Sequence, residues 1–431
     1  MKAAPKYTRQ IKDYINVVGE QDIKELQAIA EKIAGKTIVH VNSTPYGGGV
    51  AEILHSMVPV MNSLGIETRW EVLEAEEEFF NITKKIHNGL QGNINLKLTE
   101  EEWNIYLKWN QYNAELLDLD ADILLIHDPQ PMALPLFVKQ KRATWVWRCH
   151  IDLSSPNHLF WNKVASLLKH YNAVIVHSEE YVQPEFSSKA FVSPPSIDPL
   201  SEKNRELTRD EIEKVFSRFD VNIDRPTITK VARFDPWKDI FTSIDVYREL
   251  KEKIPNIQLL LISSMAKDDP EGTIFYNKVK DYIREGEAIY ILTDEIGVKD
   301  LEVNAFQRGT TVGIHTAIRE GFGLAVTEML WKHVPVVARP VGGVKKQVIN
   351  NITGFTAFDK SEIAQKVELL LIDKNLRRKI GEAGHEHVRR NFVITKHVER
   401  YLSLFAYLLM GATSYDTRNN VSSEGDQRMA P

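Results

Sequence analysis

Two basic side chains close together in the chain could bind phosphate. They belong to the run Arg233-Phe-Asp-Pro-Trp-Lys238, which directly follows a short apolar stretch typical of a buried strand. Pro236 is expected to end that strand. An arginine fork can bind two phosphate oxygens at once, and a lysine adds a compact positive charge. Two cations beyond the carboxyl end of a strand therefore suit a diphosphate, with a solvated loop as the alternative interpretation.

A second candidate is the run Arg319-Glu-Gly-Phe-Gly-Leu-Ala-Val-Thr-Glu328, which follows a predicted strand and opens a predicted helix. Gly321 and Gly323 would leave backbone N–H groups exposed at the helix start, where the helix dipole favours an anion. Glu320 precedes the turn and should face the ligand. Glu328 lies about one and a half turns into the helix, where it could accept hydrogen bonds from a ribose diol. Because carboxylates repel phosphate, Glu320 and Glu328 each suit the hydroxyls of a sugar. The alternative interpretation is a solvated acidic pair on a helix.

A glycine run, Gly47-Gly48-Gly49, lies between the first predicted strand and its helix. Glycine lets the backbone approach a phosphate closely at a helix N-terminus, although a tight turn explains the run equally well. The dinucleotide-binding pattern would need Gly or Ala where Glu52 stands, which argues against a nicotinamide-dependent oxidoreductase.

Polar side chains also gather at two strand ends in the first half of the chain. His127, Asp128 and Gln130 follow one strand, and Arg148, His150 and Asp152 follow the next. Carboxylate, imidazole and guanidinium groups suit the hydroxyls of a neutral sugar, and capping of the strand ends is the alternative. No second and third ligand at metal-binding spacing accompany His150, so no metal site is predicted.

Two features that resemble reactive sites have simpler explanations. Cys149, the single cysteine, ends an apolar strand, where a free thiol usually packs as a small hydrophobe. It excludes an internal disulfide and fits a reducing cytosol. The acidic pairs among Asp118, Asp120 and Asp122 precede a strand and so lie at the wrong end of a sheet for a metal site. A surface turn is the better interpretation.

Apolar strands alternate with amphipathic helices along the chain, which predicts an α/β fold with mostly parallel sheets. The expected strands are 37–42, 68–74, 122–128, 144–150 and 173–178, then 227–234, 257–264, 288–293, 311–316 and 334–339. Pro194, Pro195 and Pro199 separate the two groups. We therefore predict two Rossmann-like domains, 1–200 and 201–390, facing each other across a cleft, since parallel sheets bind ligands beyond their strand ends. A C-terminal helix, 391–412, is expected to pack back on the first domain, and a disordered tail, 413–431, to follow it.

Composition and charge limit the classes of molecule that the protein is expected to bind. The 431 residues carry a net charge of −5, which disfavours nucleic acid and anionic membrane surfaces as partners on electrostatic grounds. No apolar stretch reaches the roughly 18 residues of a membrane span, and the N-terminus lacks a signal-peptide core. A cytoplasmic enzyme acting on small molecules is expected. A non-catalytic sugar-binding protein is disfavoured because Arg233, Lys238, Glu320 and Glu328 are all present.

At these residues the sequence resembles the retaining GT-B glycosyltransferases of the glycogen-synthase-like family 4, whose signature matches Glu320-x7-Glu328. Within that family it is similar to the trehalose glycosyltransferring synthases over roughly residues 36–392, in the runs WRCHIDLSSPN, ARFDPWKD, DDPEGT, LEVNAFQR and IREGFGLAVTEMLW. The resemblance implies transfer of glucose from ADP- or UDP-glucose to free glucose, reversibly and with retention. It extends to retaining trehalose phosphorylases, which use glucose 1-phosphate, and to family members with another sugar acceptor.

The resemblance also implies roles for individual residues. Arg233 and Lys238 would bind the donor diphosphate, and Glu328 the ribose. Glu320 and His150 would contact the donor glucose, so that Glu320, His150, Arg233 and Lys238 form the catalytic set. The remaining donor ligands would be Gly48, Gly49, Gly321, Phe322, Gly323 and Leu324, and the acceptor ligands Asp128, Gln130, Arg148 and Asp152. No tightly bound cofactor is expected. The donor base (ADP, UDP or GDP), assistance by Mg²⁺ and a homodimer are left open.

Overall fold

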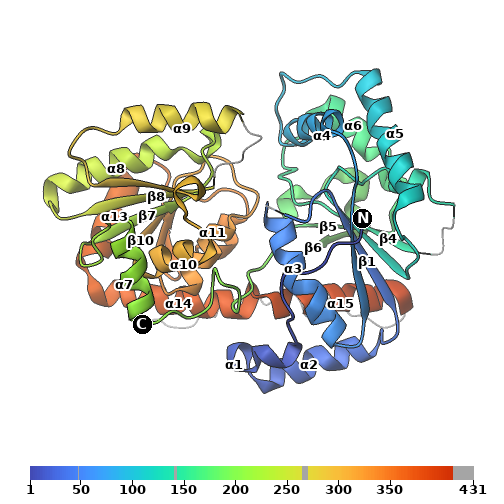
Figure 1. Cartoon of the computed structure of the whole chain (residues 1–431), viewed down its shortest axis with the longest axis horizontal. Coiled ribbons are helices and arrows are strands. Elements are labelled where there is room, and N and C mark those ends of the chain that lie inside the picture. The colour runs from blue at the N-terminus through green and yellow to red at the C-terminus, as the bar shows by residue number, and fades with distance from the viewer. Residues whose placement is uncertain (47, 140–142, 265–269, 411–431) are drawn as a thin grey trace, which may run out of the picture.

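The computed structural model describes residues 1–46, 48–139, 143–264 and 270–410. Two α/β domains lie side by side, and each is built on one six-stranded sheet (Figure 1). Neighbouring strands in both sheets are parallel, for example β1 with β3 and β7 with β8. Parallel neighbours need a crossover connection, and helices supply it on both faces of each sheet.

The N-terminal sheet has the strand order β2-β1-β3-β4-β5-β6. Its strands are β1 (Thr37–Asn42), β2 (Glu67–Val72), β3 (Ile123–His127), β4 (Thr144–Arg148), β5 (Ala173–Val176) and β6 (Ala190–Val192). The helices of this domain are α1 (Ile15–Val18), α2 (Glu20–Glu31), α3 (Gly48–Ser63), α4 (Glu77–Leu90), α5 (Glu100–Leu116) and α6 (His158–Ala165). Alternate side chains of a strand enter two different apolar cores: Leu125 packs with the α2 and α3 side, and Leu124 with the α4 to α6 side.

The C-terminal sheet has the order β12-β11-β10-β7-β8-β9. Its strands are β7 (Thr227–Val231), β8 (Gln258–Ser263), β9 (Ile289–Thr293), β10 (Val312–His315), β11 (Val336–Ala338) and β12 (Gly354–Thr356). The helices are α7 (Arg209–Arg218), α8 (Ile240–Lys253), α9 (Pro270–Tyr282), α10 (Asp300–Arg308), α11 (Leu324–Trp331), α12 (Val344–Gln347), α13 (Lys360–Ile372) and α14 (Lys374–Asn391). Because β7 and β10 are neighbours, the loops that follow them lie at the same edge of the sheet.

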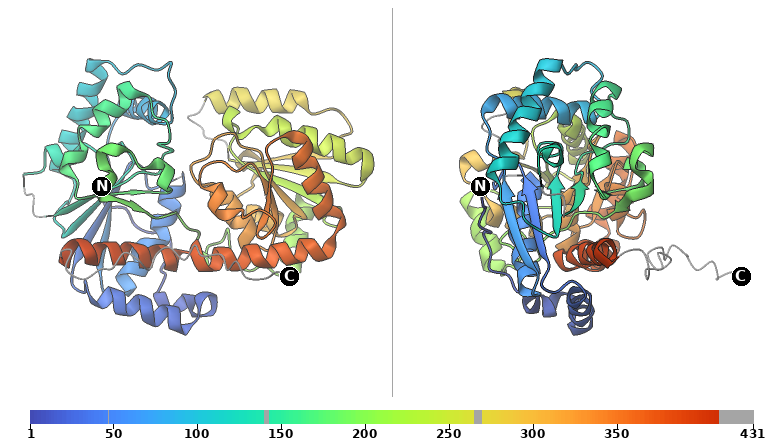
Figure 2. Two further views of the ribbon diagram at one scale, coloured as in Figure 1. Left: turned by 180° about the vertical axis from the view of Figure 1, so that it is seen from behind. Right: turned by 90° about the vertical axis from the view of Figure 1, so that its right-hand side faces the viewer.

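A long C-terminal helix, α15 (Ile394–Met410), joins the two domains. It follows α14 of the C-terminal domain and packs against α2 and α3 of the N-terminal domain (Figure 2). The chain between β6 and α7 meets it at the same junction: the Ile197 N–H donates to the Phe392 carbonyl, and the Ile394 N–H donates to the Ile197 carbonyl, both at 2.9 Å. The two connections between the domains therefore lie together.

The predicted two-domain α/β fold is confirmed, and each strand expected from the sequence is present. The edge strands β6 and β12 are not among the predicted strands, because each has three residues and lacks the apolar run that surrounds the equally short β11. The predicted tail, 413–431, lies outside the described residues. No helix in the described part of the chain has both the length and the apolar character needed to cross a membrane.

Candidate active site

Lys238 and Glu320 meet at the carboxyl edge of the C-terminal sheet. Lys238 ends a short 3₁₀ turn, η6 (Pro236–Lys238), whose start is capped by Asp235, which accepts a hydrogen bond from the Trp237 N–H at 2.8 Å. Glu320 follows β10. The Lys238 Nζ lies 2.8 Å from the Glu320 Oε2, and each side chain is 15% exposed. Two groups that the sequence placed after separate strands thus form one half-buried ion pair.

The surroundings of Glu320 keep its carboxylate ionised. Burial alone would raise the pKa of Glu320, but the charge of Lys238 and the hydrogen bond and charge of His315 hold that pKa well below its ordinary value. The His315 Nε2 lies 3.3 Å from the same Oε2 atom. The carboxylate can therefore accept hydrogen bonds from a sugar across the whole neutral pH range.

Arg233, the other predicted phosphate ligand, is not in contact with this pair. Its side chain is 61% exposed, and its Nη2 lies 3.8 Å from the Asp235 Oδ2. His87 on α4 of the other domain is near enough for Arg233 to affect it: burial, then the charge of Arg233, lowers the pKa of His87 to about 4. Arg233 therefore lies close to the N-terminal domain.

Backbone amides are available next to the ion pair. Gly323 has a φ of +83° and precedes α11, so the turn 321–324 passes from β10 into the helix through a left-handed residue. Within the described part of the chain, none of the N–H groups of Gly321, Phe322, Gly323 and Leu324 donates a hydrogen bond. The Phe322 side chain packs in the apolar core, so only its backbone faces a ligand. Unpaired amides at a helix start bind anions or hydroxyl oxygens.

The glycine run of the N-terminal domain faces this turn. Gly48 begins α3 with a φ of +77°, and a Cβ built on Gly49 would lie 3.2 Å from the Leu324 Cδ1 of the other domain. The starts of α3 and α11 therefore approach each other across the domain interface. Gly47 lies outside the described residues.

Three further contacts tie the Glu320 turn to the N-terminal domain. The Tyr181 hydroxyl donates to the Gly321 carbonyl at 2.9 Å. A Cβ on Gly321 would lie 3.3 Å from the His150 carbonyl oxygen. The Arg319 guanidinium donates to the Gln91 carbonyl. The structure thus brings His150, one of the predicted catalytic residues, against the turn that carries Glu320.

Glu328, the predicted ribose ligand, is deeply buried at 2% exposure. Its Oε1 lies 3.0 Å from the Lys203 Nζ, and its Oε2 accepts from the Gln307 Nε2 at 2.8 Å. Lys203 lies in the linker, which is the chain between β6 and α7, and it also contacts Glu52 of α3 at 3.3 Å. Each carboxylate oxygen keeps a further lone pair, so a diol remains an available partner.

Asp128, which directly follows β3 of the N-terminal domain, has a strained backbone conformation. Its φ of +62° is rare for a residue with a side chain, and such strain concentrates at functional sites. Its Oδ1 accepts a hydrogen bond from the His150 N–H at 2.7 Å. Burial raises the pKa of Asp128 to about 7, against the opposing effects of that bond and of Arg148. Near neutral pH Asp128 can therefore hold or release a proton.

The other predicted acceptor ligands are in different surroundings. Gln130 is partly buried, and its Oε1 has no hydrogen-bond partner within the described residues. The Asp152 Oδ1 accepts from the Ser154 N–H at 2.8 Å. Arg148 is fully buried on the face of the sheet that α15 covers, so it does not line a surface open to an acceptor. Its inward direction follows from the alternation of β4, because Val146, two residues earlier, packs in the core shared with α15.

A row of four histidines crosses the carboxyl edge of the N-terminal sheet. His40 Nδ1 lies 3.0 Å from His127 Nε2, His127 Nδ1 lies 3.0 Å from His150 Nε2, and His150 Nδ1 lies 3.3 Å from His177 Nε2. Burial lowers the pKa of all four, so the rings are neutral and each pair shares one proton. Both ring nitrogens of His150 are thus held by neighbouring histidines. Only His127 and His150 are candidates from the sequence, because His40 stands inside an apolar run.

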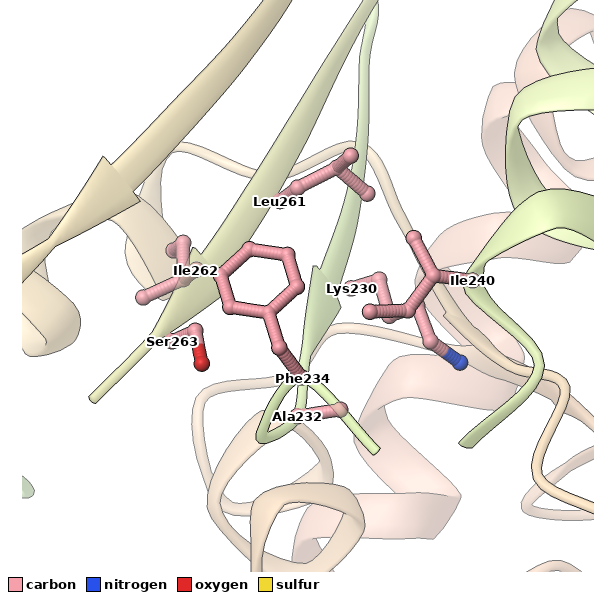
Figure 3. Close-up of a pocket in the computed structure, with 7 residues that line it drawn as sticks. All are labelled: Lys230, Ala232, Phe234, Ile240, Leu261, Ile262 and Ser263. Carbon is pink, nitrogen blue, oxygen red and sulfur yellow. The ribbon is translucent and has the colours of Figure 1, made fainter. Parts of the chain in front are cut away.

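A buried lysine lies behind the ion pair. Lys230 of β7 is 1% exposed and donates to the Thr316 Oγ1 at 2.8 Å. It lines a small hollow at the end of β7, where the ring of Phe234 lies between Ile262 and Lys230 (Figure 3). Burial, followed by the charge of Lys238, lowers the pKa of Lys230 to about 7; Arg339 acts in the same direction, and Asp239 and Glu320 oppose it.

Replacing this lysine should change how stability depends on pH. In the unfolded chain the amine titrates near 10.5, so between about pH 7 and 10.5 only the unfolded state holds its proton. The contribution of Lys230 to the free energy of unfolding is therefore greatest above about pH 10.5, decreases as the pH falls from 10.5 to 7, and is lost below pH 7. Relative to Lys230→Met, the wild-type free energy of unfolding should rise from pH 6 to pH 9, by at most about 1.4 kcal/mol per pH unit. Urea unfolding at both pH values measures this, with the exposed Lys253→Met as control. Parallel pH curves for wild type and Lys230→Met would contradict it.

Two sequence families together match most of the chain. Residues 40–183 match the family described as trehalose synthase, N-terminal domain, and residues 211–387 match glycosyl transferases group 1. A trehalose synthase of Pyrococcus horikoshii is 52% identical over 92% of this chain and 96% of its own length. One from Rubrobacter xylanophilus is 40% identical over 93% and 97%. A trehalose phosphorylase of Pleurotus pulmonarius is 26% identical over 88% of this chain but 58% of its own length.

Solved structures share the fold. Sucrose-phosphate synthase from Thermosynechococcus elongatus superposes with a TM-score of 0.67 at 16% identity, over 87% of this chain and 99% of the other. A glycosyltransferase from Rickettsia africae gives a TM-score of 0.67 at 20% identity, over 87% and 98%. The GT-B arrangement implied by the sequence resemblance is therefore confirmed.

Proposed function

The chain belongs to the trehalose synthase family of GT-B glycosyltransferases, and from this premise we propose that it moves glucose from a nucleotide-glucose to free glucose, forming trehalose with retention. The observation that carries the proposal is the Lys238–Glu320 pair, with the unpaired amides of residues 321–324 beside it and the backbone carbonyl of His150 close to Gly321. Positive charge and N–H donors thus lie next to a carboxylate and a wall of polar side chains.

The donor would lie along the turn that links β10 to α11. Lys238, Arg233 and the amides of 321–324 would bind its diphosphate, with Gly48 and Gly49 approaching from the other domain. Glu320, held ionised, would accept hydrogen bonds from hydroxyls of the donor glucose, and Glu328 would accept from the ribose. No tightly bound cofactor is needed for these contacts, because side chains and amides of the chain itself supply the positive charge.

The chain would stabilise the transition state most at the leaving oxygen of the diphosphate. As the bond from glucose to the diphosphate breaks, negative charge grows on the leaving oxygen, where Lys238 and the amides lie. The acceptor would attack from the same face and pass its proton to the departing phosphate. Asp128, Gln130 and Asp152 would orient the acceptor, while contacts between the domains such as Tyr181 with Gly321 would keep water out. No pair of carboxylates is placed for the two-step hydrolase scheme in this proposal.

The reverse reaction separates the proposed activity from phosphorolysis. The enzyme would be incubated with trehalose and ADP, UDP or GDP, or with trehalose and inorganic phosphate, and the products identified by chromatography. We expect nucleotide-glucose and glucose from at least one nucleotide, and no glucose 1-phosphate. Product from the phosphate arm alone would identify a phosphorylase, and no product in any arm would contradict both. In the forward direction, with the donor glucose carrying ¹³C at C1, NMR of the trehalose should show the labelled carbon in the α configuration, and a β configuration at that carbon would exclude retention.

A further inference from the structure

Four buried polar side chains meet where α15 covers the N-terminal sheet, close to the linker. They are Arg148 at the end of β4, His177 after β5, and His397 and Tyr401 on α15; their exposures are 0%, 4%, 1% and 1%. We call them the α15 junction cluster. The rings of His397 and Tyr401 are 4.5 Å apart, and Arg148 pairs in register with Ile175 of β5, two residues before His177. The charge of Arg148 acts on the pKa of each of the other three residues. The four groups therefore share one small region.

The polar atoms of this cluster are unpaired within the described part of the chain. The Nε, Nη1 and Nη2 atoms of Arg148 have no hydrogen-bond partner, and neither do His177 Nδ1, His397 Nε2 and the Tyr401 hydroxyl. A buried guanidinium without acceptors is very unfavourable, since its five N–H groups have left water without replacement. Native proteins rarely leave such groups unsatisfied. The cluster therefore needs an acceptor.

Among the residues that the structure describes, no side chain near the cluster supplies a matching negative charge. Burial raises the pKa of Tyr401 and of the neighbouring Cys149 thiol, so both stay neutral. Asp128, the nearest carboxylate that acts on Arg148, already accepts the His150 N–H and has a raised pKa of about 7. The other cation of this region, Arg400, donates to the Asn391 carbonyl at 3.0 Å and to linker atoms. The region thus carries excess positive charge and several free donors.

We propose that the α15 junction cluster binds a small inorganic anion of the halide class, held by the Arg148 guanidinium with the Tyr401 hydroxyl and the His397 ring. This site goes beyond the proposed function and lies on the side of the sheet that α15 covers; His177 borders the proposed donor site, since its Nε2 lies 3.3 Å from the His150 Nδ1. A compact monovalent anion suits it, because all four side chains are enclosed and because one guanidinium charge then has one counter-charge.

Binding there would strengthen the joint between the domains. The His397 Nδ1 pairs with the linker Ser196 Oγ at 2.9 Å, and Arg400, three residues further along α15, donates to the linker Ser193 Oγ at 3.3 Å. An anion on Arg148 and Tyr401 would join β4 to α15 at the same place. We therefore expect the folded protein to be more stable when the anion is present.

Thermal unfolding in different salts tests the site. The intact protein would be melted in potassium chloride, potassium bromide and potassium gluconate at equal ionic strength. We expect chloride and bromide to raise the midpoint saturably, by roughly 3 °C or more over gluconate. Arg148→Met should lose this difference, and Tyr401→Phe should shift its half-saturation to higher anion concentration. The control Arg377→Met, a half-buried arginine of α14 that donates to backbone carbonyls, should keep the full wild-type response.

Crystals grown with bromide give an independent measurement. An anomalous peak within hydrogen-bond distance of the Arg148 guanidinium would establish the ligand directly, and it does not depend on whether Arg148→Met folds. Equal melting midpoints in all three salts, together with ordered water and no bromide peak at Arg148, would overturn the proposal. A halide effect that persists in Arg148→Met would also overturn it, because the anion would then bind elsewhere.

Discussion

Lys238→Ala is expected to lower kcat about 10²–10³-fold while the protein stays folded, because the variant loses the ammonium that would face the developing charge on the diphosphate. The lysine is held at 2.8 Å from Glu320 and is still 15% exposed, so it is positioned and can reach a ligand. If the ammonium acts mainly in the transition state, kcat and kcat/KM should fall by similar factors. Initial rates of trehalose formation from nucleotide-glucose and glucose measure both.

The matched control is Lys253→Ala, which removes an ammonium from an exposed ion pair with Glu368 on the outside of the same domain. Its rates should equal those of the wild type. Circular dichroism should show the same helix content in both variants, since His315 still contacts Glu320 when Lys238 is removed. Wild-type rates in Lys238→Ala would exclude Lys238 from the chemical step.

The meeting of Lys238 and Glu320 could be anticipated from the sequence for a simple topological reason. Each residue follows a short apolar strand, and the carboxyl ends of parallel strands lie on one edge of a sheet. The strand order makes the contact possible, because β7 and β10 are direct neighbours although β8 and β9 come between them in the chain. Strand periodicity predicts the strands but not this order, so the sequence predicted proximity and not the 2.8 Å contact.

Other features depended on tertiary packing that the sequence does not reveal. Arg148 was expected to reach an acceptor, but the alternation of β4 points it toward α15, and only the position of that helix makes this face buried. Glu328 was expected to be available to a ribose, and its contact with Lys203 arises because the linker packs against α11, where the Trp331 Nε1 donates to the Asn204 carbonyl. The histidine row forms because β1, β3, β4 and β5 are adjacent in the sheet. Its members are scattered in sequence and have no common local motif.

Gly342→Ala is expected to lower both the free energy of unfolding and kcat, because Gly342 packs directly against the backbone of Glu320. Its φ is +46°, and a Cβ there would lie 1.8 Å from the Glu320 carbonyl oxygen and 2.6 Å from the Tyr181 hydroxyl. Neither atom can move freely: Glu320 is fixed to Lys238 and His315, and Tyr181 donates to Gly321. Strain and overpacking together should cost about 3 kcal/mol or more. Urea unfolding measures that loss, and the displaced Glu320 should lower kcat as well.

Gly286→Ala separates backbone strain from the steric clash of the added Cβ. Gly286 has a φ of +81°, but no atom lies within 4 Å of its added Cβ. It should cost only the roughly 1–2 kcal/mol of a left-handed residue and leave kcat unchanged. The difference between the two variants then measures the contact between Gly342 and the turn. If both lose equal stability and both keep wild-type kcat, the Glu320 turn is not held in place by Gly342. Rigid support of the carboxylate would then have to come from Lys238 and His315 alone.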